Sequence, residues 1–179
     1  MKTINLFICF ILFCVCYACS QLNYEESDYE KMADTITEAT ARKLKKKKQL
    51  YLVGTGGRMM HDVQMMAMSF YLYSEIDLST ARELIVYAIN EYLLNINENS
   101  NIKPYLCKHP FTVKNIEILI WPRKLNGSDP NINNIYFISA TDGILSYYIN
   151  LPDDTLKIIH TETFAEAQRI TLLDSNVKE

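Results

Sequence analysis

Apolar residues recur at helical spacing in three parts of the chain and predict three helices, over residues 28–47, 78–97 and 164–173. The apolar stripe of the second is the widest and runs for about five turns, which is typical of a helix packed on a core. Capping signals precede all three helices: Ser27 with Glu30, Asp77, and Thr163 with Glu166. These signals indicate that the helices begin close to the stated residues.

Alternating polarity predicts strands elsewhere. Residues 66–72 place Met66, Met68, Phe70 and Leu72 on one parity, which is strand spacing. A strand ending in "YLVG" comes before them, and the following "GTGG" lacks the Lys-Ser/Thr of a phosphate loop. We therefore interpret this glycine-rich stretch, which holds Gly54, Gly56 and Gly57, as the flexible connection of a hairpin.

The sequence pattern of the second half of the chain is typical of a β-sheet. Short β-branched and aromatic runs over 115–160 are separated by Pro, Asp, Asn or Gly, and two prolines exclude regular structure over 102–112. The fold class predicted is α+β: an antiparallel sheet of about five to six strands with helices packed on one face. Residues Leu84, Ile85 and Ala88 should then face the same sheet as Phe70 and Ile118.

The first residues have the layout of a secretory signal. One charge, Lys2, precedes an uncharged apolar run from Leu6 to Ala18, which is shorter than a membrane span. Two cleavage sites compete. Cleavage after Ala18 would leave Cys19 as a lipid-carrying first residue, because "VCYAC" is similar to a bacterial lipobox; cleavage after Ser20 would leave a plainly secreted chain. We predict a signal peptide over residues 1–18 (or 1–20), a short tether over 19–27, a single domain over 28–174 and a tail over 175–179.

Composition limits the partners and the means of stabilisation. The formal net charge is −3, which does not favour nucleic acid. Of five cysteines, three leave with the signal and only Cys19 and Cys107 remain. The mature chain is therefore no disulfide scaffold, and we expect packing to stabilise it. In a eukaryotic secreted chain, Asn126 of "NGS" would be a glycosylation acceptor.

Four stretches carry a resemblance: "GTGGRM", "DLSTAREL", "IKPYLCKHPFT" and "NIEILI". Over roughly residues 50–150 the chain resembles a family of small exported or lipid-anchored proteins of intracellular bacteria with no assigned activity. The resemblance implies an α+β domain behind a signal peptide. It supplies no functional residue.

Two candidate reactive sites follow from residue types. Cys107 and His109 are two positions apart, as a thiol and its activating base could be. Arg58 and His61 follow the glycines and could form a polar site at a hairpin mouth. The three histidines are scattered, so we predict no metal site and no cofactor.

A basic run closes the first helix with Lys45, Lys46, Lys47 and Lys48. Such a run is either a solvated helix end or a membrane-proximal patch, since each lysine near an anionic surface contributes on the order of 1 kcal/mol. The favoured function is a non-enzymatic binding domain in a bacterial cell envelope, anchored through Cys19, that binds a protein partner or a small ligand. The alternative is a small hydrolase or thiol enzyme that uses one of the two reactive sites.

Overall fold

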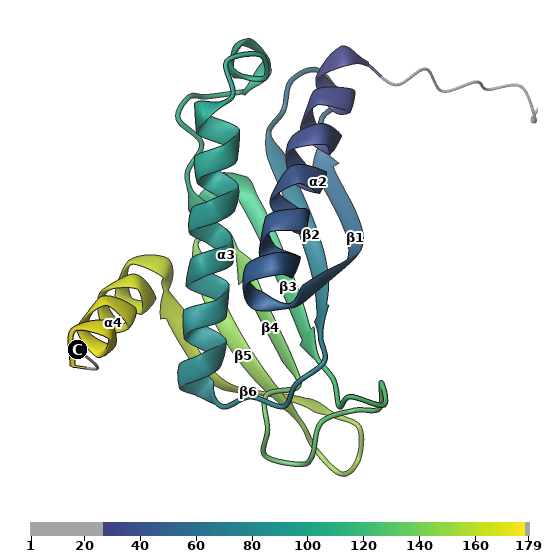
Figure 1. Ribbon diagram of the computed structural model, residues 1–179, viewed down its shortest axis with the longest axis vertical. Helices are drawn as coiled ribbons and strands as arrows, with labels where there is room; N and C mark the ends of the chain where they lie inside the picture. Colours follow the sequence, from purple (N-terminus) through teal and green to yellow (C-terminus); the bar gives the residue numbers. More distant parts are fainter. Residues whose placement is uncertain (1–26, 178–179) are drawn as a thin grey trace, which may run out of the picture.

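The computed structural model describes residues 27–177, with side chains to residue 174. Its framework is an open six-stranded sheet whose strands follow one another in chain order, with helices α2 and α3 side by side over one face (Figure 1). This architecture confirms the predicted α+β class. The predicted signal peptide and Cys19 lie outside the described residues.

The three predicted helices are confirmed. They are α2 (Asp28–Lys48), α3 (Leu78–Glu98) and α4 (Phe164–Val177), the last of which runs four residues beyond its expected end. The capping box of Ser27 and Glu30 is formed, and the Asp77 side chain accepts from the backbone N–H of Thr80 at 2.8 Å. Local capping chemistry therefore sets where α2 and α3 begin.

Neighbouring strands pair in an antiparallel manner with one exception. The strands are β1 (Leu50–Arg58), β2 (Met65–Leu72), β3 (Ile116–Pro122), β4 (Phe137–Thr141), β5 (Ile144–Asn150) and β6 (Leu156–Thr163). The exception is β2 with β3, a parallel pair that places Ile116 opposite Met66. The predicted antiparallel sheet is therefore confirmed except at this one pair, which is parallel. The cause is α3, which carries the chain back along the sheet before β3 begins.

Two smaller expectations are also wrong. Gly54, Gly56 and Gly57 lie inside strand β1, paired with β2, and the hairpin connection is residues 59–64. Lys103–Tyr105 forms a short 3₁₀ helix with a proline in its first turn, in a stretch where no regular structure was expected. Proline is compatible with the first turn of a helix, because the N–H that it lacks would have no partner there.

The core lies between the helices and one face of the sheet. Ile85 and Ala88 of α3 are fully buried with Phe70 of β2 and Ile118 of β3, and Leu84 is 8 % exposed. These residues belong to one hydrophobic cluster, which confirms the predicted facing of α3. No helix of the described part of the chain lies on the opposite face of the sheet (Figure 1).

Candidate functional site

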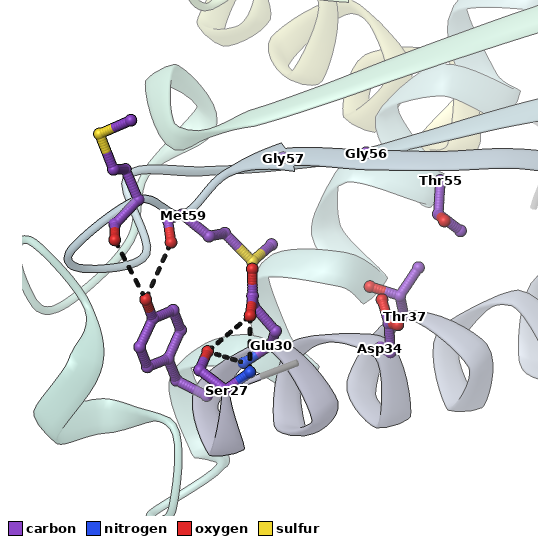
Figure 2. Close-up of a pocket in the computed structure, with 10 residues that line it drawn as sticks. Ser27, Glu30, Asp34, Thr37, Thr55, Gly56, Gly57 and Met59 are labelled. Carbon is purple, nitrogen blue, oxygen red and sulfur yellow. Dashed lines mark hydrogen bonds between the residues drawn. The ribbon is translucent and has the colours of Figure 1, made fainter. Parts of the chain in front are cut away.

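A groove runs between helix α2 and the edge strand β1. Among residues 27–177, strand β1 pairs only with β2, so no described strand lies along its other edge. A cavity of about 600 Å³ lies between the first half of α2 and the last residues of β1 (Figure 2). It is lined by Ser27, Tyr29, Glu30, Asp34, Thr37, Thr55, Gly56, Gly57, Met59 and Met60.

Hydrogen bonds hold one end of this cavity. The hydroxyl of Tyr29 donates to the carbonyl oxygens of Met59 at 3.0 Å and Met60 at 3.3 Å, which ties the hairpin loop to the first turn of α2 (Figure 2). Further along, Asp34 and Thr37 project from α2 toward β1. The cavity wall therefore presents a carboxylate and hydroxyl groups beside an open strand.

The glycines leave the backbone of β1 uncovered. A Cβ on Gly57 would lie 2.5 Å from Cε of Met59 and 2.9 Å from the carbonyl oxygen of Met65, so the close approach of the hairpin loop requires glycine there. Gly54 and Gly56 face the other side of the sheet, where ordinary contacts would be available. Their absence of side chains exposes the peptide groups of an edge strand, which can pair with another chain.

Two separate hollows lie between α2 and β1, and we call them together the groove. A second hollow of about 250 Å³ is lined by Glu38, Ala41, Arg42, Lys45, Tyr51 and Leu52. The α2 residues of both hollows recur at helical spacing from Glu30 to Lys45 and so share one face of the helix. Along this face the charge changes from acidic, at Glu30, Asp34 and Glu38, to basic, at Arg42 and Lys45.

The four lysines end α2 at the far side of the domain from its start. A helix of 21 residues spans about 30 Å, so this basic run and Ser27 lie that far apart. Two of the lysines sit on aromatic rings: the ammonium of Lys45 is 5.1 Å from the ring centroid of Tyr51, and that of Lys48 is 4.9 Å from Tyr87. Lys46 and Lys47 are exposed.

Cys107 and His109 are both exposed on the loop that follows the 3₁₀ helix. The backbone N–H of Cys107 donates to the carbonyl of Val63 at 3.0 Å, which fixes the loop but leaves the thiol at the surface. Neither residue lines the two hollows, and no hydrogen bond between them occurs in the described structure. A thiol enzyme needs both residues and a carboxylate around one concavity, an arrangement not assembled here.

Arg58 and His61 are exposed at the end of β1 and in the hairpin loop. The hairpin mouth predicted for them exists, since the loop joins β1 to β2. No ion pair or hydrogen bond between their side chains occurs among residues 27–177. Within the same part of the chain, no group of three or more His, Cys, Asp or Glu residues could hold a metal ion.

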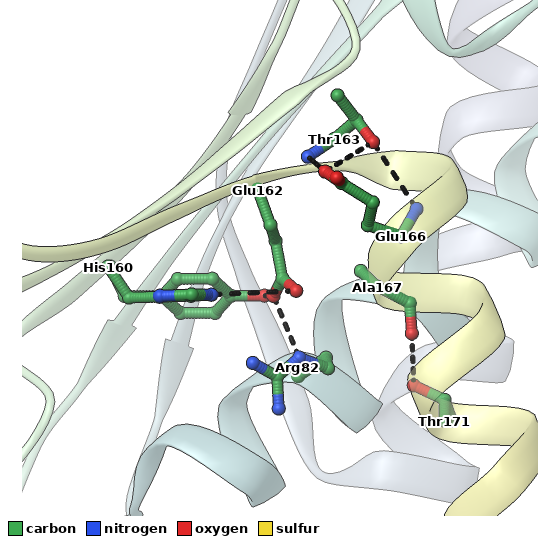
Figure 3. A network of polar contacts seen from close by, with 8 residues as sticks. Arg82, His160, Glu162, Thr163, Glu166, Ala167 and Thr171 are labelled. Carbon is green, nitrogen blue, oxygen red and sulfur yellow. Dashed lines mark hydrogen bonds and ion pairs between the residues drawn. The ribbon is translucent and has the colours of Figure 1, made fainter.

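A buried polar network that sequence reasoning missed joins α3 to strands β5 and β6 (Figure 3). Oε1 of Glu162 accepts from Nε of Arg82 at 2.8 Å and from the hydroxyl of Tyr147 at 2.8 Å. His160 lies beside them, with Nε2 3.6 Å from Oε2 of Glu162. Burial and the Glu162 carboxylate raise the pKa of Tyr147, which keeps its hydroxyl a donor. Because Tyr147 and Glu162 are buried, we interpret the network as structural.

Comparisons of the chain with protein-family models, with curated proteins and with solved structures found no match. The resemblance stated from sequence motifs therefore stays a prediction. Within residues 27–177, no helix has the length and apolar character needed to cross a bilayer.

Proposed function

We propose that this chain is an exported, lipid-anchored protein of a bacterial cell envelope whose domain is a non-enzymatic binding module. Its ligand is an extended segment of a partner protein, held against edge strand β1 beside helix α2. The observation that carries the proposal is the groove itself: an open strand edge, bare of side chains at its glycines and flanked by a helix along both hollows.

An extended segment suits this groove because an edge strand presents unpaired backbone N–H and C=O groups. A segment that adds to the edge forms main-chain hydrogen bonds, and the hollows beside it hold alternate side chains. From Glu30 to Lys45 the α2 wall spans about 22 Å at 1.5 Å per residue. An extended segment covers that length with about seven residues.

The charges of the groove define the chemistry of the segment. One end carries Asp34 and Glu38, and the other carries Arg42 and Lys45. Arg42 pairs with Glu38 at 3.3 Å near the middle, so the outer charges are the ones left to a ligand. The partner segment should be basic at the end beside Asp34 and acidic at the end beside Lys45.

The sequence supports the envelope part of the proposal. Residues 1–18 read as a signal peptide and Cys19 as the lipidated first residue. The eight residues from Cys19 to the start of α2 then keep Ser27 within roughly 30 Å of the membrane. Intact-mass measurement of the native protein tests this part alone: a chain that begins at Gln21 without added mass would refute the anchor and leave the binding proposal standing.

Two synthetic peptides test the groove. Lys-Lys-Val-Thr-Val-Glu-Glu fits an antiparallel addition to β1, because β1 runs opposite to α2 and the peptide N-terminus then lies beside Asp34. Glu-Glu-Val-Thr-Val-Lys-Lys fits a parallel addition. We expect one of them to shift the amide NMR signals of Leu52 to Gly57, with binding that weakens as salt rises.

Charge variants make this test specific. Asp34→Lys should weaken the bound peptide at least about tenfold, and the matched exposed change Asp28→Lys at the start of α2 should not. The proposal is refuted if neither peptide moves the β1 amides. It is also refuted by nuclear Overhauser contacts between β1 and residues 19–26, since the groove would then hold the chain's own segment.

A further inference from the structure

The face of the sheet away from the helices carries a continuous aromatic row. Strand register places Tyr51 opposite Tyr71, Tyr71 opposite Trp121 and Phe137 opposite Tyr148. The rings of Trp121 and Phe137 stack, which joins these pairs into one row, and all five residues are half-buried. We call this row the ridge: Tyr51, Tyr71, Trp121, Phe137 and Tyr148. No helix of the described residues lies on this face of the sheet (Figure 1), although Lys45 of α2 reaches the ring of Tyr51 at the sheet edge.

The rings of the ridge are packed against one another. The Trp121 and Phe137 rings stack with centroids 4.0 Å apart, and Phe137 lies 5.2 Å from Tyr148. The guanidinium of Arg123 sits 5.5 Å from the centroid of Tyr71 and 6.0 Å from that of Trp121. Because these ring faces are used inside the molecule, the ridge is poorly suited to stacking a flat ligand, and it presents ring edges instead.

A row of mostly small residues runs beside the ridge. Register aligns a second set of residues across the same strands. It lies two positions from the ridge along β2, β3, β4 and β5, and three positions along β1, where a bulge adds one residue. We call this row the trough: Gly54, Ser69, Leu119, Ser139 and Ser146. The two rows lie about 6.6 Å apart along the strands, so the open face has a raised band and a lowered band side by side.

We infer that this face is the interface of a homodimer, in which two copies pack sheet on sheet. The two-fold axis lies in the interface, perpendicular to the strands and midway between ridge and trough. Rotation about this axis places each strand over the same strand of the partner subunit and exchanges the two rows. The ridge of one subunit therefore fills the trough of the other. Tyr71 then meets Ser69 of the partner subunit, and Phe137 meets Ser139 of the partner subunit. Trp121 packs on the apolar Leu119 of the partner subunit.

Charge follows the same symmetry. On β3 and its continuation, the residues on the open face are Glu117, Leu119, Trp121 and Arg123, in that order along the chain. The rotation that puts Trp121 over Leu119 of the partner subunit puts Arg123 over Glu117 of the partner subunit. Arg123 also pairs with Asp129 at 2.5 Å, and its guanidinium retains further donors for a second carboxylate. Two such inter-subunit pairs would flank the apolar centre.

The area is of the right order for a stable dimer. Six strands spaced about 4.8 Å apart and four side-chain rows spaced about 6.6 Å apart project over roughly 600 Å². A corrugated surface exposes more than its projection, and standard interfaces bury about 800 Å² per partner. Tyrosine, tryptophan and arginine, which make up most of the ridge and its end, are also the residues enriched at the centres of interfaces.

Trp121 is the only tryptophan of the chain and reports on the interface directly. We expect analytical ultracentrifugation to show a monomer–dimer equilibrium, and acrylamide quenching of Trp121 to fall as dimer forms. Ser139→Arg places a charge in the trough and should weaken dimerisation at least tenfold. Ala39→Arg, on the exposed face of α2, is the matched control and should leave the equilibrium unchanged.

A charge exchange tests the symmetry itself. Glu117→Arg should weaken the dimer because it opposes Arg123 of the partner subunit, and adding Arg123→Glu in the same chain should restore it. A protein that stays monomeric up to millimolar concentration overturns the inference. A Ser139→Arg dimer within twofold of the unmodified chain overturns it as well, and this variant does not disturb the packing of Arg123 on its rings.

Discussion

Replacing Arg82 with methionine should be among the most destabilising single changes in the domain. The side chains of Arg82 and Glu162 are 12 % and 5 % exposed, and the pair bridges α3 to β6 across 80 positions of sequence. Methionine fills a similar volume but leaves the Glu162 carboxylate buried without its cation. The Tyr147 hydroxyl would then still donate a hydrogen bond to this carboxylate, but no guanidinium would compensate its charge.

The size of the effect follows from burial. Removing one partner of a buried ion pair costs about 3–5 kcal/mol, because the remaining charge loses its compensation. Replacing both partners, Arg82→Met with Glu162→Leu, should cost less than the single change, since no buried charge is left. An exposed pair provides the matched control: Arg42 and Glu38 are 70 % and 65 % exposed, so Arg42→Met should cost no more than about 0.5 kcal/mol.

Urea unfolding followed by circular dichroism measures these differences at neutral pH. Agreement requires a large loss for Arg82→Met, a smaller one for the double variant and almost none for Arg42→Met. If Arg82→Met and Arg42→Met cost the same, the network does not stabilise the fold and the reasoning from burial fails.

Three further outcomes are expected. Leu84→Ala should cost about 2–5 kcal/mol of unfolding free energy, and an unmoved midpoint would place this face of α3 outside the core. Ser27→Ala removes the α2 cap and should cost about 1 kcal/mol, measured by thermal unfolding, whereas an equal stability would show that α2 does not need it. The backbone N–H of Asn131 and the amide of Asn134 lower the pKa of Glu75 from 4.5. The ionised Glu75 carboxylate therefore stabilises the folded state above pH 4.5, and this stabilisation is lost as the pH falls through the lower pKa of the folded state. Glu75→Gln should flatten that part of the curve of unfolding free energy against pH.

The sequence by itself determined the helices and most strands, because their signals are local. The capping box at Ser27 and Glu30, the N-cap Asp77 and the alternation around Met68 each depend on residues a few positions apart. The acidic-to-basic order along α2 was also visible, although nothing local showed that this order would border an open strand. The glycines of β1 were misread as a turn, since glycine is as common in turns as it is where another backbone approaches closely.

Only the tertiary structure decided which strands pair and which distant residues are in contact. The parallel pairing of β2 with β3 depends on the path of α3, and the contact of Arg82 with Glu162 depends on how the last strand joins the sheet. The ridge takes its residues from five strands spread over almost a hundred positions, so it exists only in one register. A shift of one residue in any strand would turn its ring toward the helices. Register is set by the burial of the opposite face, and for that reason both the groove along β1 and the aromatic face are properties of the packed sheet.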